Sequence, residues 1–275
     1  MFVRAIAANA VLYDVALTAY IVAMAAALGH LVRRRESLWR FAMIATQIGW
    51  ILHTLAIAIR GVELGRLPIL TLSELVSVVI WVAVLLEIWA ERQYGMRALG
   101  AFVLPVVVGL GLVLPTGLRT LALEPAIRSA WIWVHVALAL LGLAALVLNF
   151  AAALMYLLQE RQLKARRPNA VYYRLPPLET LDQLSHRTLT LGFPFLTAGL
   201  LLGLLWAGVA WGSVLTWDPI ALFSLVMWVV YAATLAGRTV GHWHGRRAAY
   251  FAIVGFCALL LTLGAGLLLQ GRHGA

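Results

Sequence analysis

The feature that most limits how this chain can fold is a series of apolar segments, each long enough to cross a bilayer as a helix. A helix needs about 20 apolar residues to cross the hydrocarbon core, and lipid leaves backbone polar groups no partner outside the helix. We therefore predict an all-α integral membrane protein of about eight transmembrane helices. The predicted spans cover residues 12–32, 39–59, 69–90, 98–115, 131–158, 187–209, 219–237 and 247–269.

The composition supports lipid as the solvent for most of the chain. Hydrophobic residues make up 63% of the sequence and charged residues only 12%, which is too few for the surface of a soluble domain. The only cysteine, Cys257, lies in an apolar run, which excludes an internal disulfide and a cysteine-based metal centre. No CxxCH motif is present for thioether attachment of haem. We expect residues 1–275 to form a single polytopic membrane domain.

The distribution of the basic residues predicts the orientation. With the N-terminus outside, the four inner loops hold 15 of the 21 Lys and Arg residues, which is the bias that the positive-inside rule requires. We predict that both termini lie outside. The net charge of +10 then reflects membrane topology, and no nucleic-acid partner is expected.

The longest inner loop, residues 159–187, carries Leu178, Leu181 and Leu184 at spacings of three. This spacing favours an amphipathic helix at the cytoplasmic surface. It is equally typical of a simple extension of the sixth span, and the sequence leaves both alternatives open.

Three histidines fall in the outer half of the predicted topology or beyond it: His53, His135 and His273. A histidine within a span usually points into the bundle toward a partner, so His53 is a candidate functional residue. Its alternative is an interhelical hydrogen bond from an ordinary packing side chain. The alternative for His135 and His273 is that of solvated interfacial residues.

The outer loop 206–219 is rich in tryptophan: Trp206, Trp211 and Trp217 precede Asp218 and Pro219. Tryptophans at a membrane interface commonly form an aromatic belt. Flat indoles beside neutral imidazoles also suit a planar macrocycle whose iron takes histidines as axial ligands.

These residues resemble the cytochrome c assembly protein superfamily (CcsA/CcmC-like), and most of all its short YpjD/HemX-like branch. The family carries a WGxxWxWDP segment, the WWD motif, which residues 211–219 match except that Leu215 replaces the middle tryptophan. Further similar stretches are GWILHTLAIAIRG around His53, LPILTLSELVSVVIW around Glu74 and WIWVHVALALLGLAALVLNF around His135.

The resemblance implies a haem-handling protein of the bacterial cytoplasmic (inner) membrane that assists c-type cytochrome biogenesis and presents haem at the outer face. It implies haem b bound without a covalent link, with His135 and His273 as axial iron ligands and His53 as an intramembrane ligand. Trp211, Trp217 and Asp218 would belong to the surface that holds the haem.

The resemblance also implies partners: a CcsB-like membrane protein, a thioredoxin-like protein and apocytochrome c. Because the large outer domain of CcsB is absent from this sequence, we expect at most one component of a haem-attachment system and not a complete enzyme. Two rival functions remain open, a HemX-like membrane regulator of haem synthesis and a small-molecule transporter.

Glu74 is a carboxylate in the outer part of the third span. We favour a salt bridge with Arg60 or Arg66. The alternative is an indirect contact with a haem propionate, through a cation or a water molecule.

Overall fold

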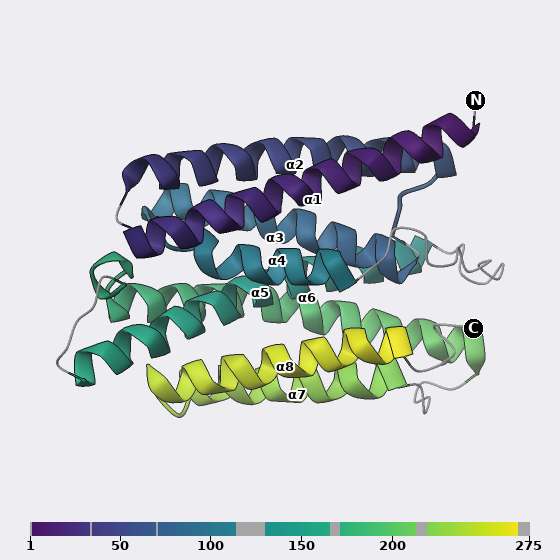
Figure 1. The fold of residues 1–275 in the computed structure, drawn as a ribbon. Helices are drawn as coiled ribbons and strands as arrows, with labels where there is room; N and C mark the ends of the chain where they lie inside the picture. Colours follow the sequence, from purple (N-terminus) through teal and green to yellow (C-terminus); the bar gives the residue numbers. More distant parts are fainter. Residues whose placement is uncertain are drawn as a thin grey trace. The chain divides into compact units, whose positions relative to one another are not determined.

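Figure 1 shows the computed structural model, which describes residues 2–33, 35–69, 71–113, 130–165, 171–212 and 219–268. The described residues form α-helices, one short 3-10 helix and connecting turns, with no strand among them. The chain divides into two compact units. Unit 1 comprises Met1–Leu118 and Leu158–Leu178, and unit 2 comprises Arg119–Leu157 and Glu179–Ala275.

Four α-helices build unit 1, and the long helix α2 lies alongside α1 in it (Figure 1). Helix α3 contacts both α2 and α4, and α4 also contacts α1. A 3-10 helix, η2, belongs to the second segment of the unit. The bounds are α1 Phe2–Arg33, α2 Glu36–Leu64, α3 Leu72–Tyr94, α4 Gly100–Val113 and η2 Tyr172–Arg174.

The two faces of α2 show why these helices pack as they do. One face is a stripe of large apolar side chains that remain about half exposed, as expected of a lipid-facing surface. The opposite face buries small residues, which allow close approach of the neighbouring helices. The exposed stripe is Ile44, Ile48, Ile51 and Leu55; the buried face includes Ala42, Ala45, Gly49, His53 and Ala56.

Local signals set the connection from α2 to α3. Helix α2 ends at Leu64 and is capped by Gly65, whose positive φ of 61° is the left-handed conformation that favours glycine. Helix α3 begins with a capping box: the Glu74 backbone N–H donates to Thr71 Oγ1, and the Thr71 backbone N–H donates to the Glu74 carboxylate.

Unit 2 is built from the greater part of α5 together with α6, α7 and α8, and the last two helices lie side by side (Figure 1). Glycines on α5 and α6 let these two backbones meet. A β-carbon on Gly142 would lie 2.9 Å from the Leu196 backbone nitrogen, and one on Gly199 would lie 3.0 Å from that of Ala139. The bounds are α5 Ala130–Lys164, α6 Leu178–Trp211, α7 Pro219–Thr239 and α8 Arg246–Leu268.

The prediction of an all-α, multi-span membrane protein is confirmed. Seven described helices are long and apolar enough to cross a membrane. The predicted span 98–115 corresponds to α4, of which 14 residues are described. The described part of α4 is therefore shorter than a membrane span, whereas the other seven α-helices reach that length. The sidedness of the termini and the single-domain organisation stay predictions.

The connection predicted over residues 159–187 is shorter than expected, because α5 continues to Lys164 and α6 already starts at Leu178. The leucines at 178, 181 and 184 therefore belong to the first turns of α6. The alternative of a helix extension is correct, and a separate amphipathic surface helix is not present at these positions.

Candidate functional site

His135 lies near the start of α5, and α6 holds its imidazole in one orientation. Its Nδ1 lies 2.6 Å from the carbonyl oxygen of Gly199. A carbonyl oxygen only accepts hydrogen bonds, so Nδ1 carries the proton and the ring lone pair is on Nε2. A second glycine, Gly203, leaves space beside the same ring, since a β-carbon there would lie 2.6 Å from Cε1. The residues therefore fix the tautomer and the direction of an imidazole whose Nε2 suits metal ligation.

The other predicted outer residues are only partly covered by the structure. Helix α6 ends at Trp211, and Gly212 follows with a φ of +70°. Trp217, Asp218 and His273 lie outside the described residues, as does the side chain of Trp211. The structure therefore describes the place where the tryptophan-rich segment begins and one of the two predicted axial ligands.

His53 on α2 is buried inside unit 1 and contacts two other helices, α1 and α3. Its Nε2 lies 2.8 Å from Ser77 Oγ on α3, and its Nδ1 lies 3.4 Å from the Tyr20 hydroxyl on α1. The Tyr13 ring meets the imidazole edge-on at 5.4 Å between centroids. The contacts with Ser77 and Tyr20 are interhelical hydrogen bonds of the kind that the packing alternative predicts. Iron ligation through Nε2 would require the Ser77 bond to open.

His53 belongs to unit 1 and His135 to unit 2. Among the described parts of the chain, no group of three or more His, Cys, Asp or Glu side chains has the arrangement of a metal site.

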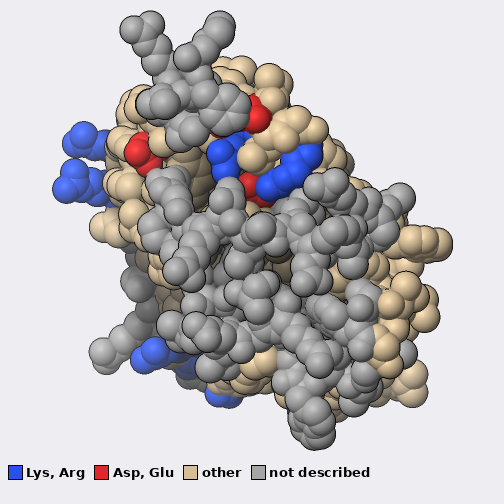
Figure 2. All heavy atoms as spheres, turned by 90° about the vertical axis from the view of Figure 1, so that its right-hand side faces the viewer, with Lys and Arg blue, Asp and Glu red and all other residues tan. Residues whose placement is uncertain are grey.

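Glu74 forms the salt bridges that the sequence favoured. Its Oε2 lies 3.0 Å from Arg66 Nη1, and its Oε1 lies 3.7 Å from Arg60 Nε. Arg60 also lies 3.6 Å from the buried carboxylate of Glu63. Figure 2 looks onto the helix ends where α2 finishes and α3 begins, and shows acidic and basic side chains side by side there. Glu74 thus forms ion pairs with two arginines and also caps α3.

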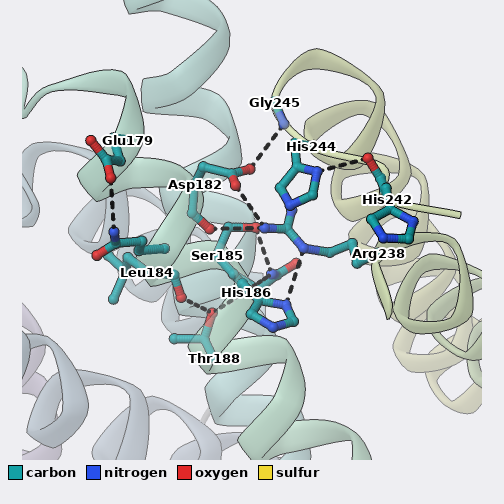
Figure 3. A network of polar contacts seen from close by, with 12 residues as sticks. Glu179, Asp182, Leu184, Ser185, His186, Thr188, Arg238, His242, His244 and Gly245 are labelled. Atoms are coloured by element: carbon teal, nitrogen blue, oxygen red, sulfur yellow. Dashed lines mark hydrogen bonds and ion pairs between the residues drawn. The ribbon is translucent and has the colours of Figure 1, made fainter. Parts of the chain in front are cut away.

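At the end of α7 that leads into α8, the buried Arg238 joins three segments of unit 2 (Figure 3). Its guanidinium donates to the Asp182 carboxylate at 3.0 Å and to His186 Nδ1 at 3.2 Å, both on α6. The other Asp182 oxygen accepts from the backbone N–H of Gly245, in the connection to α8. This network connects the ends of α6, α7 and α8.

His242 and His244, an HxH pair in the sequence, lie on the exposed connection between α7 and α8 (Figure 3). The Nδ1 atoms of these residues contact the carbonyl oxygens of Val240 and His242, respectively. These contacts are local backbone hydrogen bonds.

Sequence reasoning did not identify Gly199 and Gly203 as partners of His135. The available signal was their G-x-x-x-G spacing, which commonly marks close helix contacts in membranes. Sequence reasoning also did not predict the pair between Arg238 and Asp182, which lie 56 residues apart. The signal there was a basic residue near the end of an apolar run, which needs a partner when buried.

Comparison with known proteins identifies relatives over most of the chain. The family model described as "Cytochrome C assembly protein" matches residues 69–273. The cytochrome c biogenesis protein CcsA of Guillardia theta is 31% identical over 269 residues, covering 90% of this chain and 89% of that protein. The CcsA protein of Synechococcus sp. (strain CC9902) is 33% identical over 252 residues, covering 81% and 82% of the two chains.

Among solved structures, the cytochrome c haem lyase CcmF has a similar fold. The TM-score is 0.66 at 18% identity, and the match covers 96% of this chain. It covers 46% of the CcmF chain, so this chain spans about half the length of that protein. The similarity therefore concerns the fold.

Proposed function

The chain belongs to the cytochrome c assembly protein family, and on that premise we propose that it binds haem non-covalently at its outer face and presents it for c-type cytochrome biogenesis. Relatives named CcsA support a role in cytochrome c biogenesis and haem handling. The narrower assignment to the YpjD/HemX-like branch stays a prediction.

One observation carries the proposal: the hydrogen bond from His135 Nδ1 to the carbonyl oxygen of Gly199. A haem-ligating histidine binds iron through one neutral ring nitrogen, and its other N–H commonly donates to a carbonyl or carboxylate. His135 has this arrangement, with the lone pair on Nε2. The residues around His135 therefore fit a haem ligand, with the backbone of α6 as the orienting partner.

The other members of the proposed site extend this arrangement. His273 is the proposed second axial ligand, and Trp211, Trp217 and Asp218 are proposed to hold the flat ring and its edge. Iron bound by two histidines has both axial positions filled, which suits a protein that holds haem for transfer. We propose haem b as the bound form.

His53 is proposed as a deeper, intramembrane ligand. Its buried position in unit 1 excludes water, and its imidazole bridges α1, α2 and α3. To bind iron through Nε2, the ring would exchange the Ser77 hydroxyl for the metal. In this proposal Ser77 keeps the imidazole in place until haem arrives.

The protein is a multi-pass membrane protein, and a role in cytochrome c maturation implies haem and apocytochrome as partners. We propose that it resides in a bacterial inner membrane and works with a CcsB-like protein and a thioredoxin-like protein. Any covalent attachment of haem would then be completed with these partners.

The test is a visible spectrum of the full chain, purified in detergent and titrated with haem. We expect a Soret band in the wild type and a loss of affinity of about 10-fold or more in His135→Ala. The matched control is His242→Ala, which removes an exposed histidine and should leave the band unchanged. A wild-type protein that gives no Soret band after haem is supplied would overturn the proposal.

A further inference from the structure

Two buried glutamates, Glu87 and Glu91, lie one helical turn apart on α3. Glu87 is 1% exposed and Glu91 is 6% exposed. Neither belongs to the proposed haem site: Glu87 lies 10 residues, about 15 Å, along α3 from Ser77, the partner of His53. A buried carboxyl group in an apolar helix needs a partner or a proton, because an ionised carboxylate is costly away from water.

The carboxyl group of Glu87 is enclosed by α1 and α4. Its Oε1 lies 3.0 Å from the position that a β-carbon on Gly100 of α4 would take. The same position lies 3.6 Å from Leu104 Cδ1 and 3.8 Å from the β-carbon of Ala27, so apolar side chains surround this end. The Oε2 atom is buried and has no hydrogen-bond partner among the described residues. Tyr20 of α1 also faces Glu87, and its hydroxyl is uncharged at neutral pH.

The surroundings of Glu91 are polar by comparison. The indole N–H of Trp39 on α2 donates to its Oε1. The guanidinium of Arg97 lies over the same indole, 4.6 Å from the ring centre, and both Arg97 and Arg92 act on the Glu91 carboxyl group. A donor and two cations stabilise a negative charge on Glu91, whereas Glu87 has only apolar neighbours on its other side.

The contact between the two side chains identifies the ligand. The carboxyl groups of Glu87 and Glu91 lie within hydrogen-bonding reach of each other. Carboxylate oxygens only accept hydrogen bonds, so the contact is favourable only when one of the two groups carries a proton. A metal ion would need several more ligands, and no third His, Cys, Asp or Glu side chain in the described part of the chain completes such a site. A proton is therefore the ligand that fits.

We propose that Glu87 and Glu91 form a proton-binding site inside unit 1, in which Glu87 carries the proton and its O–H donates a hydrogen bond to the ionised Glu91. Loss of the proton would leave two negative charges side by side away from water, so the proton stays bound while the fold is intact. In the unfolded chain both side chains are in water and are ionised at neutral pH. The folded chain therefore holds one more proton than the unfolded chain. This site does not depend on haem binding.

Infrared spectroscopy of the full chain in detergent at neutral pH tests for the proton directly. We expect the difference spectrum between the wild type and Glu87→Gln to contain the carbonyl band of a protonated carboxyl group. Glutamine keeps the shape of the side chain, and its amide N–H can donate to Glu91, so the variant should fold; circular dichroism checks this. The matched control is Glu179→Gln on α6, which changes an exposed carboxylate and should leave the band unchanged.

The pH dependence of unfolding is a second readout. Because folding takes up one proton, raising the pH favours the unfolded chain, and the stability due to the bound proton is lost as the pH rises. Relative to Glu87→Gln, we expect the unfolding equilibrium constant of the wild type to rise about 10-fold per pH unit over about pH 6–8. Equal pH dependences in the two proteins would overturn the proposal.

Further outcomes distinguish a proton from other ligands. A wild type without the protonated-carboxyl band, whose carboxylate bands shift when sodium or magnesium ions are added, would contain a cation site and would overturn the proton site. If Glu87→Gln does not fold, Glu91→Gln takes its place. There the band should persist at a shifted position, because Glu87 then donates to an amide oxygen, and its absence would overturn the assignment of the proton to Glu87.

Discussion

Gly203 of α6 lies against the imidazole of His135 on α5, so closely that a β-carbon at position 203 would be 2.6 Å from Cε1 and 2.8 Å from Nδ1. The ring is therefore held between the carbonyl oxygen of Gly199 and the bare backbone of Gly203. This geometry makes Gly203 a positioning residue for the proposed ligand.

The substitution Gly203→Ala should displace the His135 ring and break its bond to Gly199. We expect the haem affinity of the outer site to fall about 10-fold, the usual cost of losing an orienting partner. The measurement is a haem titration followed at the Soret band. Gly264→Ala on α8 is the matched control, because no atom lies within 4 Å of its added β-carbon. Wild-type affinity in a folded Gly203→Ala protein would contradict the positioning role.

Glu74 offers a way to separate capping from ion pairing. In Glu74→Gln the side chain still accepts at the start of α3, so only the pairs with Arg60 and Arg66 are lost, and we expect about 1–2 kcal/mol of destabilisation. Glu74→Ala should lose about 1 kcal/mol more with the capping box. Denaturant unfolding measures both. The haem spectrum should be unchanged in each variant, and an altered spectrum in Glu74→Gln would instead favour a propionate contact.

The hydrogen bond between His53 and Ser77 tests the intramembrane ligand. Ser77→Ala should cost about 1 kcal/mol of stability and leave haem occupancy equal to or above that of the wild type, because Nε2 loses its competitor. His53→Ala should lower haem occupancy and destabilise the fold by about 2–4 kcal/mol, through the cavity it leaves. Occupancy and unfolding are measured on the same preparations. If His53→Ala changes only stability, His53 is a packing residue.

The sequence was sufficient to predict the helices because lipid imposes a simple rule of length and apolarity. The same rule failed at the end of α5 and the start of α6, where both helices continue beyond their apolar cores, to Lys164 and back to Leu178. Polar residues there can extend a helix into the headgroup region, so hydropathy alone does not mark the helix end.

The partners of the candidate site were harder to predict, because they depend on which faces of two helices meet. The count of basic residues predicts that His135 lies near the outer boundary. It cannot show that the carbonyl oxygen of Gly199 accepts a hydrogen bond from Nδ1 of His135. The ion pairs of Glu74 could be predicted from the sequence, because Arg60 and Arg66 are close to it along the chain and charged side chains in a membrane usually pair with one another. The partners of Arg238 come from residues more than 50 positions away, beyond any local pattern.

The ion pair between Arg238 and Asp182 joins α6 and α7 within unit 2. The Arg238 side chain is only 3% exposed and that of Asp182 is 19% exposed. Removing one of the two charges therefore leaves the other largely buried without its ion-pair partner. We expect Arg238→Met to destabilise the fold by about 2–4 kcal/mol, somewhat below the cost for a fully buried pair. Unfolding in detergent with added denaturant measures the loss.

A double-mutant cycle identifies the cause of that loss. Asp182→Asn should also destabilise the fold, because it leaves a buried cation, whereas the combination with Arg238→Met should recover part of the free energy. Arg40→Ala is the control, since its pair with Glu36 is exposed and should cost under about 1 kcal/mol. The outer haem band should persist in all folded variants, because Gly199 lies 17 residues, about 25 Å, along α6 from Asp182. Strictly additive losses would show that the two charges do not act as a pair.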